Sequence, residues 1–176
     1  MENSWREAVL QTLANTGSLG QESADFIRNR KVRMRFHKYS KSTGARWFLF
    51  RNISLNAHYY SPKTALDSPG MLSLLVHEVH HLKQGMWTAL SVYGELDAWQ
   101  VGFRFMKSLR VGNLHPAVEE LLSLPLNYDR ANLRRAAKLM QDYAGVGYHI
   151  NWLPLYPLHK EVGYWLLKRK PTSTQI

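Results

Sequence analysis

The chain contains no cysteine among its 176 residues. This absence excludes disulfide bonds and thiolate metal sites, so a metal ion would have to be held by histidine and carboxylate side chains. No apolar run is long enough to cross a bilayer, and the first residues, MENSWREAV, lack the basic and apolar segments of a signal peptide. We therefore expect a cytoplasmic protein with no membrane partner.

Acidic residues are also scarce, with 13 Asp and Glu against 23 Lys and Arg, which gives a net charge of +10. Such an excess can indicate nucleic acid as a partner, but basic residues scattered over a soluble surface account for most such values. The length suits one domain with a substantial core. Because no repeat or linker divides the chain, we expect a single domain over residues 1–176, with a flexible polar tail at 171–176.

The most informative stretch is LSLLVHEVHHLKQG, residues 72–85, which has His77, Glu78 and His81 in H-E-x-x-H spacing. On a helix, His77 and His81 lie one turn apart on one face, where two imidazoles can share a metal ion. In such sites the glutamate does not bind the metal but takes a proton from the attacking water. His80 could be a hydrogen-bond partner of a ligand, a surface residue, or an alternative ligand at i, i+3.

A catalytic zinc site needs a third protein ligand, and Glu95 is the candidate. A second helix, predicted over residues 88–110, follows the motif helix after a short turn at Gly85, so the two should be antiparallel neighbours. At a rise of about 1.5 Å per residue, Glu95 comes level with the two imidazoles. Asp97 is the rival, but it projects about 160° away. The stripe around Glu95 consists of small residues that allow close helix packing, namely Thr88, Ser91, Ala98 and Gly102.

The remaining pattern predicts an α+β fold that is mainly helical, with a small antiparallel sheet before the motif helix. Apolar residues alternate with polar ones over 32–36 and again over 47–55, which predicts a β-hairpin. Helical spacing and caps predict further helices at 4–15, 21–29, 115–124, 129–143 and 157–169.

The residues His77-Glu78-x-x-His81 and Glu95-Leu96-Asp97-Ala98 resemble the gluzincin metallopeptidases, especially the minimal bacterial type, over about residues 46–102. The resemblance implies that a substrate strand lies along the edge of the sheet before the motif helix, and the run 53–60 would be that edge or its continuation. Many relatives carry a carboxylate shortly after the ligand glutamate to orient a histidine, but the position one turn on is Trp99 here. Support for the histidines must then come from elsewhere, with Asn56, Gln84 or a backbone carbonyl as candidates.

The expected function is that of a zinc metalloendopeptidase with one Zn²⁺ per chain, which hydrolyses a peptide or protein substrate with Glu78 as general base. An oxyanion donor is also needed. The candidates for it are Tyr148 and His149, beside His58, Tyr59 and Tyr60. The alternative function is a catalytically reduced, metal-containing module of a basic protein that binds nucleic acid or a protein partner.

Overall fold

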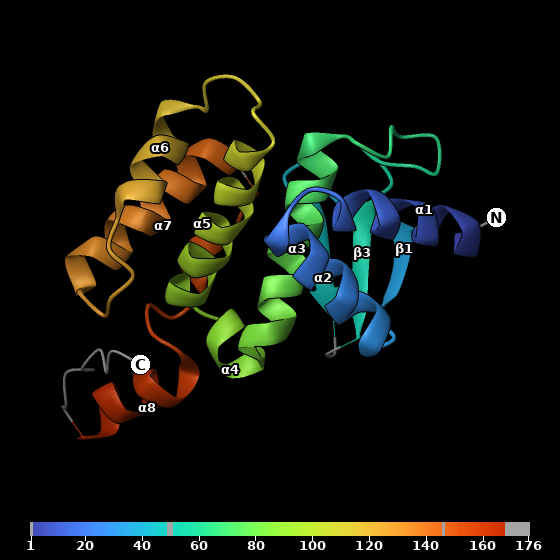
Figure 1. Ribbon diagram of the computed structural model, residues 1–176. Coiled ribbons are helices and arrows are strands. Elements are labelled where there is room, and N and C mark those ends of the chain that lie inside the picture. The colour runs from blue at the N-terminus through green and yellow to red at the C-terminus, as the bar shows by residue number, and fades with distance from the viewer. Residues whose placement is uncertain (1, 49–50, 146, 168–176) are drawn as a thin grey trace.

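The computed structural model describes residues 2–48, 51–145 and 147–167, and the predicted flexible tail lies outside these ranges. The fold is α+β and mainly helical, as the sequence predicted (Figure 1). In chain order the elements are α1 (Glu2–Ala14), α2 (Ser18–Asn29), β1 (Arg33–His37), β2 (Ala45–Phe48), β3 (Asn52–Asn56), α3 (Pro69–Gln84), α4 (Met86–Ala89), α5 (Val92–Ser108), α6 (Pro116–Ser123), α7 (Arg130–Ala144), the 3₁₀ turn η1 (Ile150–Trp152) and α8 (Leu158–Leu167).

The sheet is mixed, so the prediction of an antiparallel sheet was wrong. Its strand order is β1-β3-β2, with β1 parallel to β3 and β2 antiparallel to β3. The run 47–55, read as one strand, contains parts of both β2 and β3, and these two strands form the hairpin. Because β3 is the central strand, with Ile53 to Asn56 all buried, the expectation that the run 53–60 forms the edge of the sheet was wrong for residues 53–56. The two edge strands are β1 and β2.

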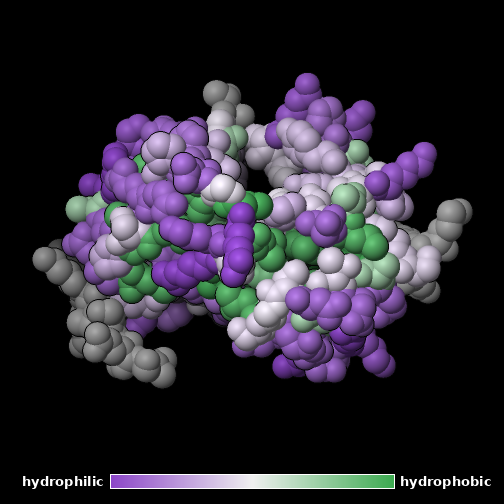
Figure 2. Space-filling model, turned by 45° about the horizontal axis from the view of Figure 1, so that its top comes forward, coloured by the Kyte–Doolittle hydropathy of each residue, from purple (hydrophilic) through white to green (hydrophobic). Residues whose placement is uncertain are grey.

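Two clusters of buried side chains form the core. The first joins α1, α2, the sheet and α3, and the second joins α5, α6, α7 and the segment from Ile150 to Tyr156. Helix α5 belongs to both, because Phe105 packs in the first cluster while Leu96 and Trp99 pack in the second. Figure 2 shows hydrophobic side chains along the middle of the face it presents, with hydrophilic ones on either side. No helix of the described ranges is both long and apolar enough to cross a membrane.

Helices α3 and α5 lie very close together, as the stripe of small residues predicted. The Ser73 hydroxyl donates to the Gly102 carbonyl oxygen at 2.8 Å. A Cβ added to Gly102 would lie 3.2 Å from the His77 Cβ, which is tighter than ordinary packing. Any side chain at position 102 would therefore push the motif helix away from α5.

The predicted continuous helix over 88–110 is interrupted. Helix α4 ends at Ala89, the chain bends, and α5 starts after Ser91, whose hydroxyl accepts a hydrogen bond from the Gly94 N–H at 3.0 Å. Ser91 is thus the N-cap of α5, and Glu95 lies in the first turn. A Cβ on Gly94 would overlap the Thr88 carbonyl oxygen, so the bend requires glycine there.

We expect Gly94→Ala to lower the free energy of unfolding by about 1–3 kcal/mol, because the added methyl overlaps backbone that cannot move independently. The matched control is Gly163→Ala in α8, where an added Cβ meets nothing within 4 Å. Removing a helical glycine there should leave stability unchanged or raise it by about 0.5–1 kcal/mol. Urea unfolding of both variants checks this, and equal effects would contradict the role assigned to Gly94.

Candidate metal centre

His77 and His81 of α3 and Glu95 of α5 converge as the sequence predicted. Their metal-binding atoms all lie within 4.8 Å of one another. The two Nε2 atoms are 3.0 Å apart, and the Glu95 oxygens lie 3.8 Å from His77 Nε2 and 3.5 Å from His81 Nε2. Two imidazole nitrogens and one carboxylate at this spacing could hold a single metal ion.

Hydrogen bonds to the other side of each imidazole fix the two rings. His81 Nδ1 lies 3.1 Å from Gln84 Oε1, and the His77 ring is hydrogen-bonded to the backbone of Ala98. Gln84 is in turn held by the Gly94 carbonyl oxygen at 3.0 Å and by an Asp97 carboxylate oxygen at 2.8 Å. Two of the three predicted supports, Gln84 and a backbone carbonyl, are therefore present.

The third predicted support, Asn56, does not reach the histidines. Its side chain bonds the backbone of the segment 39–43 and of His58 instead, which closes the loop between β1 and β2.

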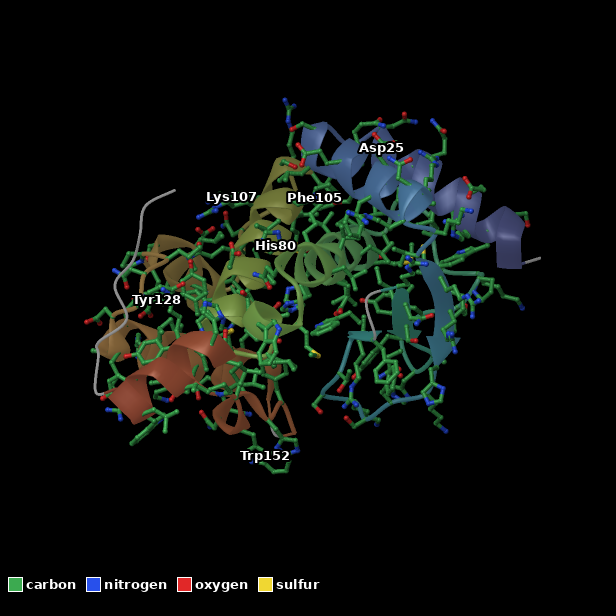
Figure 3. The ribbon with its side chains drawn as sticks, turned by 90° about the horizontal axis from the view of Figure 1, so that it is seen from below. Asp25, His80, Phe105, Lys107, Tyr128 and Trp152 are labelled. Carbon is green, nitrogen blue, oxygen red and sulfur yellow. The ribbon has the colours of Figure 1, made fainter. Side chains whose placement is uncertain are left out.

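Asp97, the rival ligand, is outside the group of three. Its Oδ2 lies 2.7 Å from His80 Nε2, so His80 and Asp97 pair on the flank of the α3–α5 contact. Figure 3 labels His80 between these helices. Because Asp97 also accepts from Gln84, this pair supports His81 through one intermediate side chain.

Tyr148 reaches the centre, where it contacts Glu95. Its hydroxyl donates to Glu95 Oε2 at 2.8 Å and accepts from Trp99 Nε1 at 2.9 Å. Trp99 thus supports Glu95 through Tyr148. This role was missed, since the contact joins residues 49 apart in the chain.

The other predicted oxyanion candidates lie less centrally. His149 also lines the cavity that holds the three converging side chains, but it is exposed and stacks on Trp152, whose side chain lies at the outer edge of the molecule in Figure 3. The Tyr59 hydroxyl donates to the Lys41 carbonyl oxygen, and His58 is exposed. Tyr60 lines the same cavity as the three converging side chains.

Burial and mutual charge set the protonation of the metal-free centre. Burial and the neighbouring His81 lower the pKa of His77 to about 3, so this imidazole is neutral at pH 7. Burial acts in the same direction on His81, but the Glu95 carboxylate outweighs it and raises the pKa of His81. Burial would raise the pKa of Glu95, yet the two histidines and Tyr148 lower it to about 2. The three side chains therefore include a neutral imidazole and a carboxylate, both ready to bind a cation.

Glu78 lies beside this group and keeps one carboxylate oxygen without a partner. The side chain is 4% exposed, and within the described ranges its Oε2 has no hydrogen-bond partner. Burial raises the pKa of Glu78 to about 7, against the lowering effects of His81 and of the Trp47 backbone N–H. A buried carboxylate with a free oxygen costs stability, which is typical of functional sites.

The group lies in a cavity of about 830 Å³ between the two core clusters. One wall consists of residues 42–48, which include β2, and the other comes from α5, α7 and the segment 147–153. The lining is largely apolar and aromatic, as in sites that bind an organic substrate. The contribution of β2 was missed, since strand order is not readable from alternation alone.

We expect one divalent metal ion to bind per chain. Each of the variants His77→Ala, His81→Ala and Glu95→Ala should weaken the affinity of the chain for the ion by at least about 100-fold. The loss of a residue that only hydrogen-bonds to a metal ligand already costs about 10–100-fold. His149→Ala is the matched control and should bind normally. Metal content after dialysis, measured by mass spectrometry, checks this. Unchanged binding in all three ligand variants would disprove the centre.

We also expect Glu78→Gln to stabilise the metal-free protein, with a defined pH dependence. The raised pKa means that the folded chain holds this proton more tightly than the unfolded chain, so wild-type stability falls as pH rises from 4.5 to about 7 and levels off above it. The variant lacks this loss and should be more stable by about 3 kcal/mol at pH 8 and equal at pH 4. Urea unfolding across this range measures the difference, with the exposed Glu22→Gln as control; a pH-independent difference would contradict the assignment.

Comparisons with models of protein families, with curated protein sequences and with solved structures found no match for this chain. The description of the site therefore rests on its geometry. Two imidazoles and a carboxylate that could hold a metal ion lie in a cavity beside Glu78, one of whose oxygens has no hydrogen-bond partner within the described ranges.

Proposed function

We propose that this chain is a zinc-dependent peptidase of the gluzincin type, which hydrolyses peptide bonds in a peptide or protein substrate. One observation carries the proposal: a buried glutamate with an unpartnered oxygen lies beside three side chains suited to one metal ion. A purely structural metal site gains nothing from such a glutamate, whose desolvation costs stability. A hydrolytic site needs it as a base.

The donor set supports zinc as the ion. Two histidines and one glutamate hold zinc in several hydrolases, with the fourth position left open. Tetrahedral zinc at its usual bond lengths sets ligand atoms roughly 3.3 Å apart, and the separations of 3.0, 3.5 and 3.8 Å lie around that value. When bound, zinc supplies a Lewis acid that polarises a carbonyl group and makes water a better nucleophile at neutral pH.

Glu78 acts as the general base in this proposal. Burial raises the pKa of Glu78, which makes its carboxylate a better proton acceptor, so that it can take a proton from the attacking water and then give it to the leaving amine. The Trp47 backbone N–H bonds Glu78 and holds it in place. Tyr148 orients Glu95 rather than serving the oxyanion, because its hydroxyl proton is already donated to that carboxylate.

The free edge of β2 is the place for an extended substrate. Strand β2 has a single neighbour in the sheet, β3, and the Trp47 N–H is directed at Glu78. A substrate strand paired with β2 would thus run past the base and the three proposed ligands. Residues 45–48 also line the cavity, with the Trp47 ring centroid 5.9 Å from that of His81.

We expect the zinc-loaded protein to cleave denatured casein or a mixed peptide library, and Glu78→Gln to lower kcat by about 10²–10⁴-fold, the usual contribution of a positioned base. The variant should keep its zinc, since no proposed ligand is changed. Glu22→Gln, an exposed glutamate in α2, is the matched control and should be fully active.

Two outcomes would overturn parts of this proposal. Undiminished hydrolysis by Glu78→Gln would remove Glu78 as base. Stoichiometric zinc in a wild-type protein that cleaves no member of the library would favour the alternative, a metal-containing binding module without peptidase activity.

A further inference from the structure

A second cavity, of about 740 Å³, lies away from the metal centre, between the start of α1, the end of α2 and β1. We call it the basic hollow. Five of its eight lining residues are cationic, and one is acidic. The lining consists of Arg6, Glu7, Arg28, Lys31, Val32, Arg33, Met34 and Arg35.

The hollow runs along the free edge of β1. Successive side chains of a strand point to opposite faces of a sheet, so a cavity lined by every residue from 31 to 35 must follow the edge. Strand β1 has only β3 as a neighbour in the sheet, and in Figure 1 it lies on the side of β3 toward which α1 extends. The Arg33 N–H faces that neighbour, because it donates to the Arg51 carbonyl oxygen at 2.7 Å. The N–H groups of Met34 and Phe36 therefore point to the opposite, open side.

Three of the cations have no acidic partner. Within the described ranges Lys31, Arg33 and Arg35 form no ion pair, and Arg35 donates only to the amide oxygen of Asn52 at 3.2 Å. By contrast, Arg6 and Arg28 both contact Glu7. The positive charge of the hollow is thus largely uncompensated along the strand edge.

Lys31 is held in a backbone conformation that favours glycine. Its φ is +52°, at the point where α2 ends and the chain turns into β1. Helices often end on such a left-handed residue, and glycine is the usual choice there because any Cβ is strained. Lys31 therefore adds a positive charge to the lining of the hollow at a position where glycine would be less strained.

We infer that the basic hollow binds an acidic peptide segment in extended conformation, which adds to β1 as a further strand. The open N–H and C=O groups of β1 supply the main-chain hydrogen bonds, and Lys31, Arg33 and Arg35 select acidic side chains. A single-stranded nucleic acid fits less well, because the lining contributed by the described residues includes no aromatic side chain for base stacking. The inference does not depend on the proposed peptidase activity.

The test uses the full chain and a fluorescein-labelled peptide of about eight residues that alternates Glu and Thr, long enough to cover the five residues of β1. We expect fluorescence anisotropy to detect binding at about 50 mM NaCl that weakens at about 300 mM, since exposed charges are screened. The Met34 and Phe36 amides should exchange more slowly with solvent when the peptide is bound. A Lys-Thr peptide should not bind.

The variant combines Lys31→Gly, Arg33→Thr and Arg35→Thr, and should weaken binding by about tenfold, as expected for three partly exposed charge contacts. Glycine suits the left-handed position and threonine suits a strand, so the fold is preserved. The control removes three charges elsewhere: Arg110→Gly, also at a left-handed position with φ +55°, with Arg134→Gln and Lys63→Gln on exposed side chains. It should bind the peptide as the wild type does.

Several outcomes would overturn the inference. Equal binding by the two triple variants would show that only the overall charge matters. Equal binding of the same peptide with every backbone nitrogen methylated would exclude strand addition. Tighter binding of an oligothymidylate of the same length, or no protection of the Met34 and Phe36 amides, would point to a polyanion site instead.

Discussion

The contact between α3 and α5 is the constraint on which the rest of the structure depends. Gly102 lets the two backbones approach, and the Ser73 hydroxyl bridges them at 2.8 Å. Only at this separation can Glu95 reach both His77 and His81, and only then can Gln84 span from one helix to the other. Small residues at this helix interface therefore bring a carboxylate close to two imidazoles.

The same closeness concentrates buried charge. Glu95, His81 and Glu78 are all shielded from water, and the pKa of His81 is shifted by both carboxylates, while His81 in turn lowers the pKa of each carboxyl group. Glu95 is satisfied by two histidines and by the Tyr148 hydroxyl, whereas Glu78 keeps one oxygen unpaired. Two carboxylates in one cavity thus have opposite pKa shifts, which is the usual way that one site holds both a ligand and a proton acceptor.

The sequence predicted the local part of this arrangement and missed the long-range part. The motif helix and its stripe of small residues follow from helical periodicity, which also identified Glu95, although the predicted helix was really two, with a bend at Ser91. The bend did not alter the predicted position of Glu95, because α4 continues the turn that brings α5 back along α3. The parallel pairing of β1 with β3 was missed because alternation does not encode strand order. Tyr148 was identified as a site residue, but its partner was not, since contacts across 53 residues leave no periodic signal.

The three proposed ligands do not all come from the same part of the molecule. The two histidines are on α3, which packs in the first core cluster, while Glu95 and Tyr148 are held by α5 and by the segment after α7, which pack in the second. An ion bound between them would therefore add a cross-link between the two core clusters, which α5 already joins. Because such an ion would bind the folded chain, a site proposed for catalysis would also strengthen the contact between the two clusters.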